Sequence, residues 1–291
     1  NWLTEAGIDF PSEEVEDTGI IYYSRFYKLP EGQKLPVGDR LVAGDLGYLK
    51  YGVFWGDNNT FSITFATSDT DKTFWGIKDP DMFEDVTRLI PAAAEWLELE
   101  AKPITSVHSM AGLLNRKRTL CGPNGIVVDS FHLVGDALIC TNPLYGRGCS
   151  TGFWQAHLLA QSIQSNNNNS IAQGEQFAQN IEENILPWYS ASVESDKGNR
   201  ASSENDEDEL SVMKKSILKE GLIPATRTSA KVWRAFMKMM NLLAEPKILS
   251  EPDVSLEIMR VWEQRGFRKP DPPLGPSRQE MIEHLQLAEN V

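Results

Sequence analysis

A chain of 291 residues with 41% hydrophobic residues is long enough for about two domains with substantial cores. Its formal net charge of -13 argues against a nucleic-acid partner, and no run approaches the roughly 18 apolar residues that cross a membrane. Three cysteines without a CxxC pair and four scattered histidines indicate neither a disulfide scaffold nor a metal site. We therefore expect a cytoplasmic protein with no integral membrane segment, no nucleic-acid partner and no metal.

The N-terminal part of the chain has the pattern of an antiparallel sheet. Residues 19–29 are rich in tyrosine and isoleucine and end before a Pro-Glu-Gly turn. Two further apolar runs, 46–55 and 61–67, are separated by residues 56–59, which read Gly-Asp-Asn-Asn and predict a hairpin. In the second run apolar and hydroxyl side chains alternate, which predicts one buried face and one solvated face. Two helices are expected to follow, over 80–89 and 91–99, with Asp79 as the N-cap of the first.

On the first predicted strand, Tyr23, Arg25 and Tyr27 share one face, because side chains alternate along a strand. The other face carries Tyr22, Ser24 and Phe26. Arg25, placed between two aromatic rings, could orient an acidic substrate or a flavin edge. An ordinary surface arginine that lies beside the tyrosines is the commoner case. Tyr23, Arg25 and Tyr27 are therefore candidate substrate-binding residues with a structural alternative.

Residues 134–152 read Val-Gly-Asp-Ala-Leu-Ile-Cys-Thr-Asn-Pro-Leu-Tyr-Gly-Arg-Gly-Cys-Ser-Thr-Gly and combine an acidic turn, a Pro/Gly loop and a helix start. The preceding run, residues 131–134, is typical of a short buried strand. Asp136 follows it, where a carboxylate can accept hydrogen bonds from sugar hydroxyls. From Cys149 onward the apolar residues have helical spacing, so free N–H groups and the positive end of the helix dipole point back at the loop. The loop therefore suits a flat ligand that carries negative charge.

This segment resembles the second FAD motif of the para-hydroxybenzoate-hydroxylase-like flavoproteins, a family of flavin monooxygenases, epoxidases, geranylgeranyl reductases and flavin-dependent halogenases. The family pattern is a strand ending in Gly-Asp-Ala, a proline, two closely spaced glycines and a helix. The matching residues here are Gly135, Asp136, Ala137, Pro143, Gly146 and Gly148. Ile139 stands where histidine is common in the family, so the resemblance does not identify a substrate. A plain strand, loop and helix, with glycines needed only for turning, is the alternative interpretation.

The cofactor-binding residues that the resemblance implies are Asp136, Pro143, Gly146, Gly148, Cys149 and Ser150. Asp136 would bind the ribityl or ribose hydroxyls of FAD, and Pro143 would lie beside the reactive edge of the isoalloxazine. The backbone from Gly148 to Ser150 would face the pyrimidine carbonyl. In this family an antiparallel sheet covers the flavin and carries the substrate, which assigns that role to the N-terminal sheet.

The other half of an FAD site is a Gly-x-Gly-x-x-Gly turn between a strand and a helix, and no such sequence occurs in these residues. The chain also begins at Asn1 without a methionine. We therefore expect the C-terminal part of a longer flavoprotein, which on its own would hold FAD weakly or not at all.

After the motif, helices are expected over 171–189, 209–220, 229–243 and 253–264. Residues 194–209 contain seven acids and almost no apolar residues, which predicts a solvated acidic loop. The third helix has an apolar stripe and basic residues elsewhere on its surface. The stripe consists of Val232, Trp233, Phe236, Met240 and Leu243. Packing in a core is the commoner explanation of such a stripe, and contact with a membrane surface is the alternative.

These patterns predict an α+β protein, a fragment of an α/β flavoprotein. Residues 1–112 would form the substrate-binding antiparallel sheet with helices, 113–165 the C-terminal part of the FAD-binding domain, and 166–291 a helical region. The predicted function is that of an FAD-dependent oxidoreductase, most simply a monooxygenase that uses NAD(P)H and acts on a small organic molecule. Dehydrogenase, reductase or halogenase chemistry would use the same site, because the cofactor performs the reaction. A non-catalytic relative that serves as a binding or interaction module is the alternative.

Overall fold

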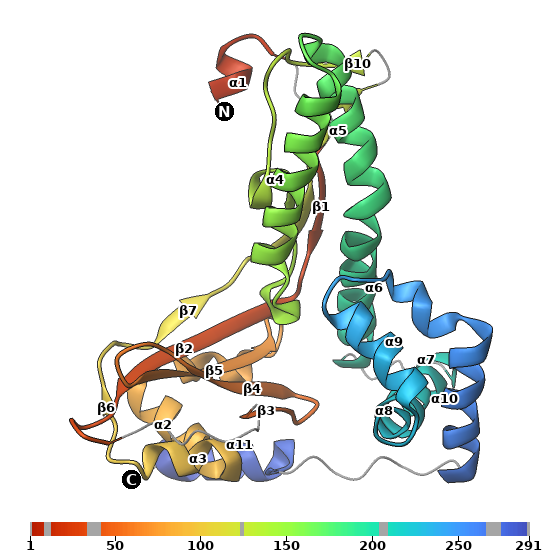
Figure 1. The fold of residues 1–291 in the computed structure, drawn as a ribbon. Helices are drawn as coiled ribbons and strands as arrows, with labels where there is room; N and C mark the ends of the chain where they lie inside the picture. Colours follow the sequence, from red (N-terminus) through yellow and green to blue (C-terminus); the bar gives the residue numbers. More distant parts are fainter. Residues whose placement is uncertain are drawn as a thin grey trace. The chain divides into compact units, whose positions relative to one another are not determined.

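The computed structural model describes residues 2–8, 13–33, 42–122, 125–203, 209–265 and 275–289. The chain forms two compact units (Figure 1). We name residues 19–113 with 271–291 the sheet unit, and residues 1–18 with 114–270 the helical unit. Both contain strands and helices, so the expected α+β class is confirmed. Among the helices of the described residues, none has the length and apolar character needed to cross a membrane.

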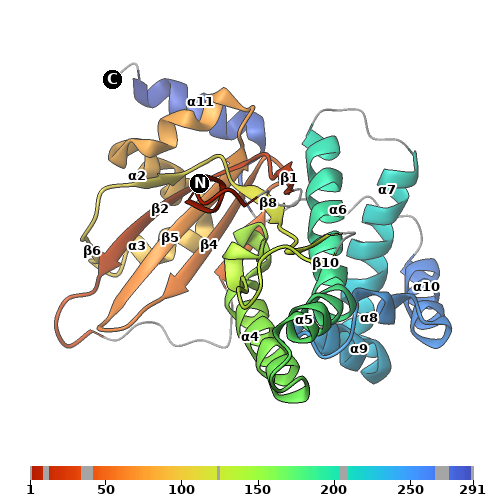
Figure 2. The same ribbon diagram turned by 90° about the horizontal axis from the view of Figure 1, so that it is seen from above.

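The sheet unit is an antiparallel sheet with helices. Its elements are β2 Ile20–Lys28, β3 Val42–Asp45, β4 Leu49–Trp55, β5 Thr60–Ser68, the 3₁₀ helix η1 Lys72–Lys78, α2 Pro80–Leu89, α3 Pro91–Leu97, β6 Lys102–Pro103, β7 His108–Met110 and α11 Arg278–Glu289. The strands pair in the order β3-β4-β5-β2-β6, and β7 also pairs with β2. Figure 2 shows β2, β5 and β4 side by side.

The predicted hairpin between β4 and β5 is confirmed. Asn58 and Asn59 have positive φ angles of 56° and 57°. Thr60 N donates to Asp57 O at 3.0 Å, and Gly56 N donates to Thr60 O at 2.8 Å. Two successive residues with positive φ form the turn whose twist matches that of the two strands, and asparagine tolerates this conformation.

The predicted buried face of β5 is also confirmed. Phe61, Ile63 and Phe65 are each at most 1% exposed. Helices α2 and α3 cover them, with ring centroids of Phe65 and Phe83 4.9 Å apart and those of Phe61 and Trp96 5.0 Å apart. Burial of these large side chains, each contributing roughly 1.5–3 kcal/mol, holds the helices against the sheet.

The C-terminal helix belongs to this unit, which corrects the expected division that placed all of 166–291 in one helical region. Met281 of α11 is fully buried in the core of the sheet unit. Tyr48 donates a hydrogen bond to Pro276 O at 2.9 Å, and Arg278 pairs with Asp71 at 3.0 Å. The sequence gives no sign of this long-range packing, because Met281 lies in a short helix that could cover either unit.

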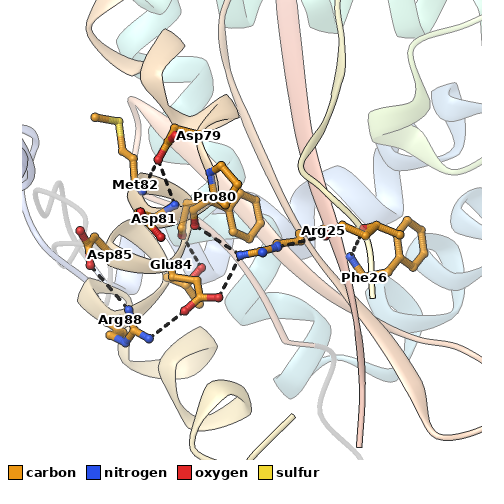
Figure 3. A network of polar contacts seen from close by, with 12 residues as sticks. Arg25, Phe26, Asp79, Pro80, Asp81, Met82, Glu84, Asp85 and Arg88 are labelled. Carbon is orange, nitrogen blue, oxygen red and sulfur yellow. Dashed lines mark hydrogen bonds and ion pairs between the residues drawn. The ribbon is translucent and has the colours of Figure 1, made fainter. Parts of the chain in front are cut away.

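Arg25 lies on the helix-covered face of β2, which corrects its interpretation as a surface residue (Figure 3). Its Nη1 bonds Glu84 Oε1 of α2 at 2.9 Å and Pro80 O at 3.3 Å, and its side chain is 11% exposed. Tyr23 and Tyr27 on the same face are 3% and 0% exposed. Burial, the largest cause, raises the pKa of Tyr27 to about 12, so its hydroxyl stays neutral. All three side chains are thus packed inside the unit, although in the described part of the chain the buried Tyr27 hydroxyl has no hydrogen-bond partner.

Replacing Arg25 by methionine is expected to cost about 1–3 kcal/mol of the free energy of unfolding, because a half-buried acceptor loses a charged donor while the apolar stem is kept. Arg88, which is 57% exposed and also bonds Glu84, is the matched control, and Arg88→Met should cost less than about 1 kcal/mol. Urea unfolding measures both variants. Equal losses for the two would show that Arg25 is no more than a surface residue.

The helical unit begins with α1 Trp2–Glu5 and small strands. These are β1 Glu14–Asp17, β8 Leu114–Lys117, β9 Cys121–Gly122, β10 Gly125–Ile126 and β11 Ile139–Cys140, with the 3₁₀ helices η2 Gly135–Ala137 and η3 Pro143–Tyr145. The remaining elements are α4 Gly148–Ser165, α5 Ser170–Asn184, α6 Leu186–Ser203, α7 Glu209–Ser216, the π-helix η4 Ile217–Leu222, α8 Ile223–Thr228, α9 Ala230–Met240, η5 Pro246–Ser250 and α10 Pro252–Arg265. β8 pairs antiparallel with β1 and β11.

Three expectations for this unit need correction. The pairing of β1 with β8 places residues 1–18 here rather than with the sheet. Residues 131–134 form no strand in the described part of the chain, and Val134, which has an extended backbone, is 38% exposed. Residues 194–203 of the expected acidic loop continue α6, and residues 204–208 lie outside the described residues. The helix continues because Asp196 lies on its packed face, where it is 5% exposed.

The apolar stripe of α9 is divided between core and solvent. Val232 is fully buried against the neighbouring helices, and Phe236 packs against the same cluster. Trp233, Met240 and Leu243 are 48%, 46% and 76% exposed. Core packing therefore explains only part of the stripe.

Candidate functional site

The loop between β11 and α4 has a defined geometry. Pro143–Tyr145 forms one 3₁₀ turn, and Asn142 caps it by accepting a hydrogen bond from Leu144 N at 3.1 Å. Gly146 ends the turn in the left-handed conformation with φ of 62°, and its N–H bonds Pro143 O at 2.9 Å. A residue with a side chain would be strained at Gly146, so the backbone favours glycine at this position.

Helix α4 begins directly after the loop, at Gly148, one residue before the expected start at Cys149. Gly148, Cys149 and Ser150 are exposed, and no side chain caps the helix. Its first N–H groups and its positive dipole end are therefore open to a ligand. An anionic or carbonyl group at this position would accept hydrogen bonds from them.

Asp136 lies beside the start of α4. It is exposed, and a Cβ added at Gly148 would lie 3.9 Å from Asp136 Oδ1. The turn that carries Asp136 is held against α4, because Gly135 N donates to Gln155 Oε1 at 2.7 Å. A Cβ at Gly152 would come within 3.5 Å of Gly135 Cα, so a small residue allows this close approach. The structure thus places Asp136 close to Gly148 at the start of α4.

Asp196 is the centre of a buried hydrogen-bond network that holds the loop, and sequence reasoning missed it. Its carboxylate accepts hydrogen bonds from Asn115 Nδ2 at 2.6 Å, Asn142 Nδ2 at 2.9 Å and the Tyr145 hydroxyl at 2.7 Å. Asn115 Oδ1 accepts from Asn142 N at 2.8 Å. Asn115, Asn142 and Asp196 are 0%, 1% and 5% exposed. The network ties the loop to β8 and to α6.

Arg147, the middle residue between the two loop glycines, was also missed. Its guanidinium lies over the Trp188 ring at 4.9 Å and the Tyr145 ring at 5.7 Å from the centroids. Within the described residues its Nε is buried without a hydrogen-bond partner, and burial lowers the pKa of the guanidinium. This stacking holds the loop against Trp188 of α6, in addition to the Asp196 network, because arginine packs readily on aromatic faces.

The Cys140 thiol has no sign of special reactivity. Burial raises the pKa of the Cys140 thiol, and the nearby Asp136 carboxylate raises it further. Cys149 is free and exposed at the start of α4. Cys140 therefore stays a neutral thiol.

A cavity of about 370 Å³ lies between the β8 to β10 region and α5. Phe177 and Ile181 contribute apolar walls, and Cys121 and His132 also line it. Burial lowers the pKa of His132, and Asp129 partly opposes this. None of the expected cofactor-binding residues lines the cavity.

In the sheet unit, we name the face opposite α2 the open face, because two of its aromatic side chains are exposed. Phe26 of β2 and Phe54 of β4 are 42% and 52% exposed, and both are paired across the strands with Ser62. Ser24 and Thr64 hydroxyls share a hydrogen bond of 2.8 Å in the next row. Ser62 is 8% exposed, so this face is less solvated than the alternation of side chains predicted. It offers two aromatic side chains around small polar groups.

The chain is similar to one curated protein and to solved structures. No family model matches the chain. Protein Rv3254 of Mycobacterium tuberculosis is 26% identical over 178 residues, which cover 57% of this chain and 34% of that protein.

Two solved structures share the fold. HpxO of Klebsiella pneumoniae, complexed with FAD and uric acid, has a TM-score of 0.53 at 14% identity and is matched over 81% of this chain and 55% of its own. A flavoprotein/dehydrogenase of Cytophaga hutchinsonii has a TM-score of 0.52 at 14% identity over 91% of this chain and 60% of its own. The chain thus spans about a third of the curated relative and just over half of the solved proteins. The resemblance to FAD-dependent flavoproteins is confirmed at the level of the fold.

Proposed function

We propose that the chain belongs to an FAD-dependent oxidoreductase, most simply a monooxygenase that acts on a small organic molecule. The arrangement of Asp136, the loop at Gly146 and the open start of α4 carries this proposal. It occurs on a fold shared with a protein that was solved with FAD bound. The use of NAD(P)H and the cytoplasmic location stay predictions.

The chain's own residues would bind and orient the cofactor. The exposed Asp136 carboxylate would accept hydrogen bonds from ribityl or ribose hydroxyls. The loop backbone from Pro143 to Gly148 would lie against the ring, and the first N–H groups of α4 would stabilise negative charge on the pyrimidine side. FAD, when bound, supplies the redox chemistry.

The substrate would bind to the open face of the sheet unit. It would not bind to the opposite face, which carries Tyr23, Arg25 and Tyr27. Phe26 and Phe54 offer apolar contact, and Ser24 and Thr64 offer hydroxyl groups that fix orientation. A flat, mostly apolar molecule with one or two polar groups fits this composition.

The proposal is tested by replacing Asp136 with alanine in the full-length protein. The loss of a charge-assisted hydrogen bond of about 1.5–3 kcal/mol should weaken FAD binding by about ten- to a hundredfold. Titration of the apoprotein with FAD, followed by flavin fluorescence, measures the affinity. Glu263→Ala, which removes an exposed carboxylate of α10, is the control and should leave the affinity unchanged.

A full-length protein that binds no flavin would support the non-catalytic alternative. Unchanged affinity in Asp136→Ala would show that this carboxylate does not touch the cofactor.

A further inference from the structure

The segment from α8 to η5 differs in charge from the rest of the chain. Residues 223–250 contain five basic residues and one acidic residue, whereas the whole chain has a formal net charge of -13. The same segment carries Trp233, Met240 and Leu243, all of which are about half exposed or more. Lys231 pairs with Asp253 and Lys247 with Glu245, so the basic side chains of this segment that lie in no ion pair among the described residues are Arg227, Arg234 and Lys238.

The two kinds of side chain lie on adjacent sides of α9. Val232 and Ala235 face the core and are 0% and 5% exposed. Trp233 and Met240, seven positions apart, share one side of the helix. Arg234 and Lys238, four positions apart, are exposed on the neighbouring side. In the described part of the chain neither of them lies in an ion pair, so their charges are available.

The end of α9 holds a further apolar side chain in solvent. Leu242 N donates to Met239 O at 3.1 Å, and Leu243 N donates to Lys238 O at 2.8 Å. This pair of bonds places Leu242 in the left-handed conformation, with φ of 58°, at a position where glycine is usual. The next residue, Leu243, is 76% exposed. A strained turn thus presents an exposed leucine where a polar residue would serve the helix end equally well.

We infer that α9 and the turn after it bind the surface of a membrane that contains anionic phospholipids. Trp233, Met240 and Leu243 would enter the boundary between headgroups and acyl chains, and Arg234 and Lys238 would meet the phosphates. The inference is independent of the proposed oxidoreductase function.

A lipid surface fits these residues better than a second copy of the chain. A two-fold contact centred on α9 would bring Arg234 and Lys238 against their own counterparts, and like charges at close range repel. An anionic surface satisfies the basic and the apolar groups together.

Vesicle flotation of the full-length protein tests the inference. The protein should float with vesicles of equal parts phosphatidylcholine and phosphatidylglycerol at low salt, and not with phosphatidylcholine alone. Arg234→Gln with Lys238→Gln should lower the partition coefficient on the order of thirtyfold, because each basic residue contributes about fivefold. The double variant with Trp233→Ser and Leu243→Ser should lower the partition coefficient by about tenfold or more.

Ile171→Ser with Lys102→Gln is the matched control, since it removes an exposed apolar and an exposed basic side chain elsewhere. It should float like the wild type, and circular dichroism should show that all variants are folded. Failure of the wild-type protein to float, equal flotation with both vesicles, or unchanged flotation of the α9 variants would overturn the inference. A dimer in gel filtration that the α9 variants lose, without any flotation, would assign this surface to a second copy instead.

Discussion

Replacing Asp196 by alanine is expected to lower the free energy of unfolding by about 3–5 kcal/mol. The change removes the buried acceptor that three donors share, on Asn115, Asn142 and Tyr145, and the Tyr145 hydroxyl keeps only a longer bond to Ser192 O at 3.5 Å. Each buried donor left unpaired costs about 1–3 kcal/mol, although the three losses are not additive. Asp196→Asn keeps the shape and one acceptor, so its cost should be smaller, about 1–2 kcal/mol.

Urea unfolding followed by circular dichroism measures these differences. Glu194 is the matched control, because it is an exposed acid two residues earlier on the same helix. Glu194→Ala should change the free energy of unfolding by less than about 0.5 kcal/mol. If Asp196→Ala were as mild as Glu194→Ala, the network would not hold the loop.

Local features of the fold could be predicted from the sequence. The hairpin at Asn58 and Asn59 depends on residues that accept positive φ, and the alternation in β5 depends on side-chain period alone. The start of α4 and the preference for glycine at position 146 also follow from short-range chemistry. Each of these is decided within a few residues.

Features that depend on a distant partner could not be predicted. Asp196 stands in an acidic stretch that reads as solvated, and its role depends on Asn115, 81 positions away. One signal was present, because Trp188, Ser192 and Asp196 are spaced four residues apart and so continue one face of a helix. Arg25 likewise bonds Glu84, 59 positions later, and this contact could not be predicted from the strand that carries Arg25.

Residues 131–134, which were expected to form a strand, show the same dependence on a distant partner. Their apolar side chains favour a strand, but a strand forms only where a neighbour offers backbone groups. Among the described residues no strand pairs with them, and β11 lies beside β8 instead. The local apolar pattern therefore does not determine whether residues 131–134 pair with another strand.

Gly148→Val is expected to reduce flavin affinity by more than about a hundredfold. A branched side chain at the start of α4 would fill the space that the proposed ring needs, and the backbone could no longer approach it. The fold itself should tolerate the change, since a Cβ at Gly148 would meet only Asp136 Oδ1 at 3.9 Å. Loss of flavin without loss of folding is therefore the expected signature. His284→Ala, on the exposed face of α11, should keep its flavin.

The flavin-to-protein ratio of the full-length protein, measured by absorbance after gel filtration, tests the central claim most directly. The proposed site predicts a flavin band in the wild type, a reduced ratio in Asp136→Ala, and almost no flavin in a folded Gly148→Val variant. A wild type without flavin, or full flavin in both folded variants, would show that the segment from Val134 to Gly152 is only a turn before a helix.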